Sequence, residues 1–227
     1  MESSNLEFYR NSIDYILSVQ NKDGSIPWEL DEKLDPWDHI EAAMGLSIAG
    51  KKDEAEKAFL WLSDSQLIDG SWYAEYLNSI PMTQRKETNF SAYIGTGLWH
   101  YYLIFKDKDF IENMLPTLSK ALDFVLSMQT ENGDIYWACE EDKQILDDSL
   151  ITGSSSIYKS LECTAAILNL FEKPVESIIV SMEKLKNSFR EEYALLDSLS
   201  LKYAKLMSML PRGRLSLTGT RVRALDF

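Results

Sequence analysis

The chain has 227 residues, of which 45% are hydrophobic and 26% are charged, a composition typical of a folded protein with one sizeable core. Its net charge of −13 argues against nucleic-acid binding and against docking on anionic membranes, since both need clustered Lys and Arg. No basic start leads into an apolar run, and no stretch of about 18 apolar residues occurs. We therefore expect no signal peptide, no membrane span and a cytoplasmic location.

Three similar segments recur along the chain, each with a Gln, a polar turn that contains Gly, and then a Trp. They occupy residues 20–28, 66–72 and 129–137. Their separation suits two helices with connections rather than strands. The Gly of each segment is typical of a helix end followed by a sharp turn. The sequence thus predicts repeated helical hairpins.

The segments before each turn are predicted to be amphipathic, charged helices. In the first, Ser3, Ser4 and Asn5 are candidate caps, and in the third Pro116 begins or kinks the helix. The segments after the turns, at 41–50, 91–105 and 151–168, are rich in small residues and poor in charge. Helices of that kind are usually buried on most sides.

Charged helices that alternate with small-residue helices predict an all-α fold, an α/α toroid with an inner and an outer ring. A bundle of long antiparallel hairpins is the alternative. We expect one toroid-like domain over residues 1–210, with further helices after Pro174 but no fourth turn of the same kind. Residues 211–227 lack a helical stripe and are predicted to be a poorly ordered tail.

In a toroid, the first residues of all inner helices lie at the same end of the central cavity. We call this end the mouth, and here several of those residues are acidic. The candidate catalytic residues are Asp38, Glu41 and Glu87, because neighbouring carboxylates can serve as general acid and general base. Asp38 and Glu41 are three apart and are expected to share a helical face. Asp35, which precedes Pro36, is better explained as a helix cap. Capping is also the alternative for the other acids.

Polar and aromatic residues of the inner helices are candidate ligand contacts. Trp37 lies beside the acids, whereas Trp28, Trp72 and Trp137 are expected to hold neighbouring hairpins together. The histidines and acids form no metal signature, and the sequence leaves the cofactor unknown. Two cysteines give no disulfide framework; Cys163 is expected in the core and Cys139 in a turn. The candidate substrate-binding residues are Trp37, His39, Asn89, Tyr93, Trp99, His100 and Ser155.

The Gln–Gly–Trp turns resemble the QW-type repeats of the terpenoid cyclase and protein prenyltransferase superfamily, whose fold is an α/α toroid. The segments 35–76, 87–103, 121–138 and 150–168 are similar to bacterial proteins labelled prenyltransferase. The resemblance implies an isoprenoid or lipid-linked substrate. Neither the Asp-x-Asp-Asp nor the Asp-Asp-x-x-Asp motif of terpene enzymes is present, however, and no zinc set can be assembled. A full toroid needs about six hairpins, so we expect an incomplete one.

Three interpretations of function stay open at this point. The first is a prenyltransferase-like or cyclase-like enzyme that uses the mouth acids on an isoprenoid, a glycan or a lipid-linked sugar. The second is a glycoside hydrolase or lyase of the six-hairpin type, which the acids and Trp residues suit. The third is a non-catalytic binding or scaffold protein. All three predict a small-molecule, isoprenoid or glycan ligand and no nucleic-acid partner.

Overall fold

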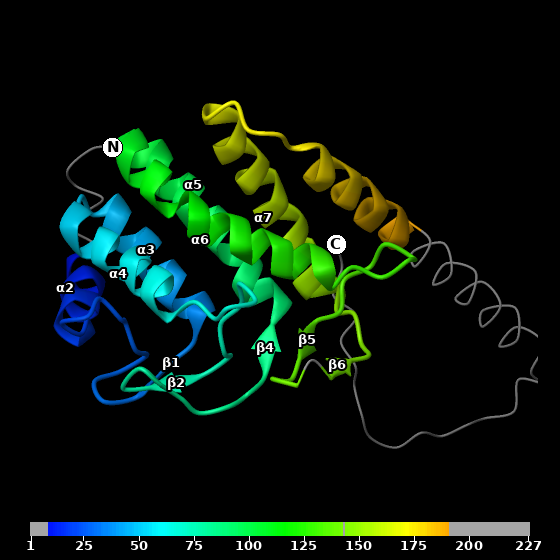
Figure 1. Cartoon of the computed structure of the whole chain (residues 1–227). Helices are drawn as coiled ribbons and strands as arrows, with labels where there is room; N and C mark the ends of the chain where they lie inside the picture. The colour runs from blue at the N-terminus through cyan, green and yellow to red at the C-terminus, as the bar shows by residue number, and fades with distance from the viewer. Residues whose placement is uncertain (1–8, 143, 191–227) are drawn as a thin grey trace, which may run out of the picture. The chain divides into compact units, whose positions relative to one another are not determined.

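The computed structural model describes residues 9–142 and 144–190 and is built of alternating helices (Figure 1). The helices expected in the outer layer are α2 (Arg10–Val19), α4 (Lys52–Ser65) and α6 (Lys108–Ser127), and a further helix occupies residues 176–190. Those expected in the inner layer are α3 (Pro36–Ile48), α5 (Thr88–Phe105) and α7 (Ile151–Leu170). The all-α prediction and the alternation of two helix types are therefore confirmed.

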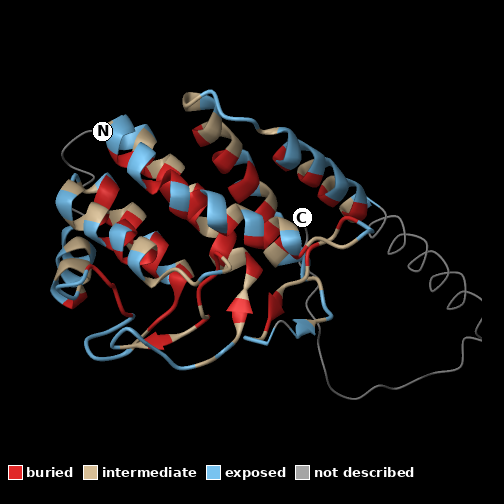
Figure 2. Cartoon of the chain, viewed as in Figure 1, coloured by how far each residue is buried: buried red, intermediate tan, exposed pale blue. Residues whose placement is uncertain are grey.

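The two kinds of helix differ in how they are buried (Figure 2). Helix α6 buries one stripe, with Ile111, Met114, Leu118 and Val125 at 2% exposure or less. The inner helices carry few charges and pack on one another, α3 against α5 and α5 against α7. A helix apolar on most sides is stable only when neighbours cover it from several directions. This arrangement is the two-layer hairpin repeat that the sequence predicts, not a simple bundle.

Small residues let the inner helices approach closely. A Cβ atom added to Gly95 of α5 would lie 2.2 Å from Oγ1 of Thr164 in α7. One added to Gly97 would lie 2.6 Å from Cγ2 of Ile40 in α3. Both distances are below van der Waals contact, so a larger side chain at either position would push the helices apart.

The turns between outer and inner helices contain short strands that the sequence did not predict. Strands β1 (Lys33–Leu34), β2 (Tyr76–Leu77) and β3 (Ile80–Pro81) form an antiparallel sheet in that order. Strands β4 (Lys86–Glu87), β5 (Ala138–Cys139) and β6 (Ile145–Leu146) form another. Each sheet joins the turns of two hairpins, Lys33 opposite Leu77 and Glu87 opposite Ala138. The strands lie at one end of the helices in Figure 1, so α3, α5 and α7 all begin at this end.

The Gln of each turn fastens that turn to the next outer helix. Nε2 of Gln20 donates to the carbonyls of Gly24 and Glu54, the latter in α4. Nε2 of Gln66 makes the same pair of bonds, to Gly70 and to Thr117 of α6. Gln129 repeats it with Gly133 and with Ser181 of the helix at 176–190.

The Gly of each turn lies directly on the backbone of that same outer helix. All three have positive φ, between 91° and 98°. A Cβ atom at Gly70 would lie 2.0 Å from the carbonyl oxygen of Lys120, and the equivalent contacts of Gly24 and Gly133 are with Lys57 and Lys184. Only glycine combines this conformation with so close an approach. The repeated Gln and Gly are thus parts of one joint between successive hairpins.

The local predictions fare differently. Pro116 lies inside α6, whose N-cap is Asp107, so it does not begin that helix. Cys139 lies in the third turn as expected, where it is buried in β5, and Cys163 is buried in α7 as expected; both are free thiols. The candidate caps Ser3, Ser4 and Asn5, the domain boundary at 210 and the tail 211–227 fall outside the described residues. Among the described helices, none has the length and apolarity needed to cross a membrane.

Candidate active site at the start of the inner helices

The residue before helix α3, Asp35, accepts a hydrogen bond at each of its two carboxylate oxygens. Oδ1 of Asp35 accepts from the backbone N–H of Asp38 at 2.9 Å, which makes Asp35 the N-cap, with Pro36 in the first turn. Oδ2 accepts from Nε1 of Trp28 at 2.8 Å. Burial, together with repulsion from Asp38, raises the pKa of Asp35. The interpretation of Asp35 as a cap is confirmed.

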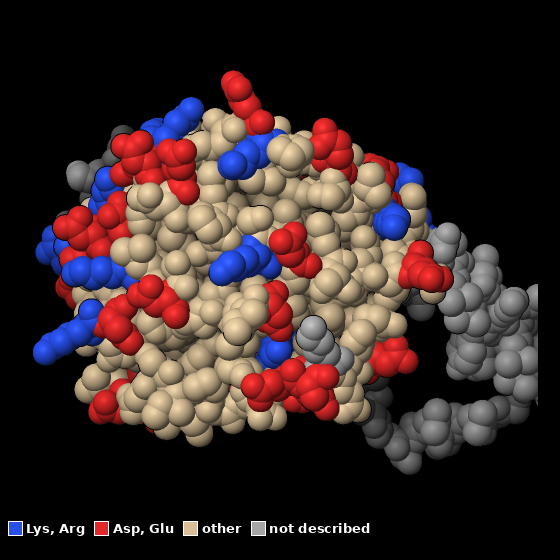
Figure 3. Space-filling view, in the orientation of Figure 1, with Lys and Arg blue, Asp and Glu red and all other residues tan. Residues whose placement is uncertain are grey.

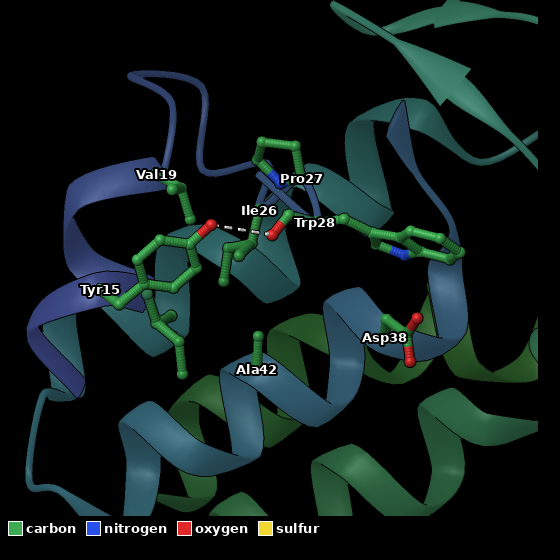
Figure 4. A pocket seen from close by; sticks show the side chains of 8 residues that line it. Tyr15, Val19, Ile26, Pro27, Trp28, Asp38 and Ala42 are labelled. Atoms are coloured by element: carbon green, nitrogen blue, oxygen red, sulfur yellow. Dashed lines mark hydrogen bonds between the residues drawn. The ribbon is translucent and has the colours of Figure 1, made fainter. Parts of the chain in front are cut away.

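Asp38 is exposed and lines a hollow of about 280 Å³ between α2 and α3 (Figure 4). Its other walls are mainly apolar: Tyr15, Ile16, Val19, Ile26, Pro27, Trp28 and Ala42. The hydroxyl of Tyr15 donates to the carbonyl of Trp28 at 3.3 Å and ties α2 to the turn. The hollow therefore places one exposed carboxylate beside apolar and aromatic surface.

Glu41 points instead toward α5, where it joins two aromatic rings. The rings of Trp37 and Tyr93 stack with centroids 3.8 Å apart and planes 7° apart. Nε1 of Trp37 and the hydroxyl of Tyr93 both donate to Oε1 of Glu41, at 3.0 and 3.3 Å. Burial and the nearby Glu41 raise the pKa of Tyr93 to about 12, so its phenol keeps its proton. Asp38 and Glu41 are both exposed, but Asp38 lines the hollow whereas Glu41 accepts hydrogen bonds from the two stacked rings.

Glu87 is the N-cap residue of α5 and forms a salt bridge with Arg85. Nη2 and Nε of Arg85 both lie 3.0 Å from Oε1 of Glu87, whose side chain is 13% exposed. The guanidinium of Arg85 also lies over the ring of Trp137, 5.6 Å from its centroid. Burial raises the pKa of Glu87, Arg85 opposes that rise, and the charge of Asp35 adds to it. Asp35 and Glu87 are therefore within electrostatic range of each other.

His39 is enclosed in the core rather than open to a ligand. Its Nδ1 accepts from the backbone N–H of Ile26 at 3.1 Å, so Nε2 carries the proton and donates to the carbonyl of Ala58 at 2.9 Å. The side chain is 0% exposed, and burial lowers its pKa to about 4. This geometry favours a structural role, in which neutral His39 links the first turn to α4.

The remaining predicted contacts are spread along α5 and α7. Asn89 is half-buried in the first turn of α5, close to Glu87. Trp99 and His100 come about three turns later, roughly 16 Å along the axis, and Trp99 stacks on Tyr102. Burial lowers the pKa of His100. Ser155 is exposed in α7, and its hydroxyl donates to the carbonyl of Ile151 at 2.7 Å. The structure thus groups Trp37, Glu41 and Tyr93. Among the described residues, Trp99, His100 and Ser155 make no hydrogen bond or ring contact with that group.

Sequence reasoning missed two residues that the structure places at this mouth. Trp28 was expected between hairpins, but it is 48% exposed and bonds to Asp35, with Nζ of Lys33 4.0 Å from its ring centroid. Arg85 was not singled out. Its signal was available, because residues two apart in an extended segment share a face, and Arg85 precedes Glu87 by two. Trp72, by contrast, is buried and donates to the carbonyl of Leu62, as a packing residue should.

The surface around the helices carries mixed charge. On the face drawn in Figure 3, basic side chains are interspersed with acidic ones and form no continuous basic patch. Within residues 9–142 and 144–190, no three His, Cys, Asp or Glu side chains are grouped as metal ligands would be.

Comparison with solved structures identifies the class of fold as the α/α toroid. The unsaturated glucuronyl hydrolase of Bacillus sp. GL1 superposes with a TM-score of 0.64 at 16% identity, over 84% of this chain and 57% of that one. A family 105 glycoside hydrolase of C. acetobutylicum gives 0.61 at 14% identity, over 81% and 56%. The cellobiose 2-epimerase of Spirochaeta thermophila gives 0.56 at 16%, over 83% and 55%. At these identities the likeness shows the fold alone.

A curated relative is more similar in sequence. The MMP endo-(1,4)-3-O-methyl-α-D-mannosidase of Mycolicibacterium hassiacum is 36% identical over 182 residues, which are 80% of this chain and 50% of that protein. The chain thus spans about half the length of this relative. No family model matches the sequence.

These comparisons correct part of the resemblance drawn from the sequence. The toroid fold is confirmed, but the similar proteins named above act on carbohydrates by their descriptions, and none is described as a prenyltransferase or terpenoid cyclase. The findings therefore favour the six-hairpin carbohydrate-active interpretation over the isoprenoid one.

Proposed function

We propose that this chain is a glycoside hydrolase of the six-hairpin α/α-toroid type that acts on α-linked, O-methylated mannose glycans. The observation that carries the proposal is the pair of carboxylates Asp38 and Glu87, at the starts of neighbouring inner helices and beside exposed aromatic rings. The similarity to a 3-O-methyl-α-D-mannosidase supports the choice of sugar.

The two carboxylates suit different roles in hydrolysis. Glu87 is half-buried and its pKa is raised, which favours the protonated form that a general acid needs. Asp38 is exposed and has room for water beside it. In the proposed reaction Glu87 gives its proton to the glycosidic oxygen as the C1–O bond breaks. Asp38 takes the proton of the water whose oxygen bonds to C1.

The surroundings favour a neutral sugar with apolar substituents. The mouth carries the acids Asp35, Asp38 and Glu41 besides the proton donor Glu87. Its cation Arg85 is paired with Glu87, so an anionic uronate would meet repulsion here. The apolar walls of the hollow beside Asp38 suit methyl groups and the C–H faces of sugar rings. Stacked Trp37 and Tyr93 offer aromatic surface of the kind that binds sugar rings.

The test is product analysis by mass spectrometry after incubation with three oligosaccharides. These are an α-(1→4)-linked 3-O-methylmannose oligosaccharide, its unmethylated counterpart and an unsaturated glucuronyl disaccharide. We expect the methylated mannoside to be cleaved fastest and the uronate to stay intact. Cleavage of the uronate instead would overturn the choice of substrate. Binding of the methylated sugar without any product would overturn the catalytic assignment and favour the binding-protein interpretation.

A further inference from the structure

Arg85 lies where it can control the state of Glu87 through a direct salt bridge. Both guanidinium contacts are made with the same carboxylate oxygen, Oε1, each at 3.0 Å. Among the contacts of residues 9–142 and 144–190, no hydrogen bond is made by Oε2. One oxygen of the carboxyl group is therefore held, and the other is available.

Arg85 is itself anchored by the turns of two hairpins. Its backbone carbonyl accepts from the N–H of Ala74 at 2.7 Å, within the second turn. Its guanidinium lies over Trp137 of the third turn, whose carbonyl accepts from the N–H of Thr88 at 2.8 Å. Stacking on an aromatic face and pairing with a carboxylate are the two interactions for which a planar guanidinium is suited. The position of the cation thus depends on the joint between the second and third hairpins.

We propose that Arg85 is the positioning residue of this site: it fixes Glu87 through Oε1, leaves Oε2 for the glycosidic oxygen, and stabilises the carboxylate that remains after proton transfer. The proposal rests on the proposed function in that Glu87 is taken as the proton donor. Nothing in the similarity to other proteins assigns this part to Arg85.

Among the residues that the structure describes, few other charges face Glu87. Asp35, at the start of α3, acts on it with the opposite sign to Arg85. Lys86 points away and pairs with Asp69 at 2.8 Å. From β5, Ala138 lies opposite Glu87, and burial raises the pKa of the neighbouring Cys139, which keeps the thiol neutral. Within residues 9–142 and 144–190, Arg85 is therefore the cation that acts on the charge of Glu87.

The experiment compares the pH dependence of kcat/KM for the wild type, Arg85→Met and Arg85→Lys. A general acid must be protonated, so activity falls as the pH rises through its pKa. Removal of the neighbouring cation raises that pKa. We expect Arg85→Met to shift the alkaline limb of the pH–activity profile to higher pH by about one unit. The same variant should lower kcat more than it changes KM. Arg85→Lys should move the limb less. Lys159→Met removes one exposed positive charge on α7 and should leave the limb in place.

A second measurement does not depend on activity. The carboxyl carbon of Glu87 is followed by NMR in protein labelled with ¹³C-glutamate and assigned with Glu87→Gln. The midpoint should rise in Arg85→Met by the same amount as the alkaline limb. If the wild type hydrolyses no glycan but the midpoint still rises, the proposed function fails while the control of Glu87 by Arg85 stands. If activity is present and neither the limb nor the midpoint moves, the inference about Arg85 is wrong.

Discussion

The two halves of each turn make an instructive comparison. The first half, with its Gln and Gly, makes the same contacts in all three hairpins: two amide hydrogen bonds and one backbone approach to the next outer helix. The second half, which leads into the inner helix, differs every time. It carries Asp35 in the first hairpin and the Arg85–Glu87 pair in the second. The repeated Gln and Gly hold the fold, whereas these unrepeated charged residues supply the candidate chemistry.

The largest expected effect is a loss of activity when the acids in the second half of the turns are substituted. Asp38→Asn and Glu87→Gln remove the proposed base and acid, and each should lower kcat/KM by about 100-fold or more. Neither should change the melting temperature greatly, since neither side chain takes part in the Gln and Gly contacts with the outer helices. Asp64→Asn makes the same chemical change at an exposed site of α4 and is the matched control. Full activity in both mouth variants would show that the chemistry lies elsewhere.

A smaller but clear effect should appear on stability when the joint is damaged. Gly70→Ala brings a Cβ to within 2.0 Å of the carbonyl oxygen of Lys120 and also forces a positive φ on alanine. We expect a loss of about 3 kcal/mol in the free energy of unfolding. Gly50→Ala has the same sign of φ but nothing within 4 Å of the new atom, and should cost about 1 kcal/mol. Urea denaturation of the two variants measures the difference, and equal losses would contradict the close-approach argument.

The buried histidine adds a pH dependence to the first joint. The pKa of His39 is about 4 in the folded protein against 6.5 for a histidine in water, so the unfolded chain binds its proton first. The stability that neutral His39 contributes is complete above pH 6.5 and is lost as the pH falls toward 4. Between pH 7.5 and 5 we expect a loss of about 2 kcal/mol. In His39→Gln this contribution should be missing, and an unchanged pH dependence in that variant would refute it.

The smallest expected effect tests whether the three joints are equivalent. Gln20→Ala, Gln66→Ala and Gln129→Ala each remove two partly buried hydrogen bonds. Each should lower the free energy of unfolding by about 1 kcal/mol, because the freed carbonyls regain some contact with water. A large loss of stability in one variant and none in the others would mean that the three Gln residues, although repeated in sequence, do not contribute equally to the free energy of unfolding.

Periodic features were the ones that could be predicted from the sequence. The Gln–Gly turns, the amphipathic helices and the small-residue helices repeat, so each prediction is supported several times over. Asp35 could also be assigned, because a carboxylate before proline has one common local role. The side-chain partners at the mouth could not be predicted, because they depend on how different hairpins meet. Glu41 with Tyr93 and Arg85 with Trp137 are contacts between segments far apart in the chain. Trp28, by contrast, bonds to Asp35 within the same turn, a local contact that no repeat in the sequence signals.

The central claim, that the mouth binds a glycan and the joints do not, can be tested by watching the tryptophan indoles. Their Nε1–H groups are resolved in a ¹⁵N–¹H NMR spectrum, and each is assigned by substitution. On addition of an α-(1→4)-linked 3-O-methylmannose oligosaccharide, we expect the signals of Trp28 and Trp37 to shift, since these indoles bond to the mouth carboxylates Asp35 and Glu41. The signal of Trp72, whose indole bonds to the carbonyl of Leu62 inside the core, should stay in place. Unmoved signals for Trp28 and Trp37 at saturating sugar would contradict the account.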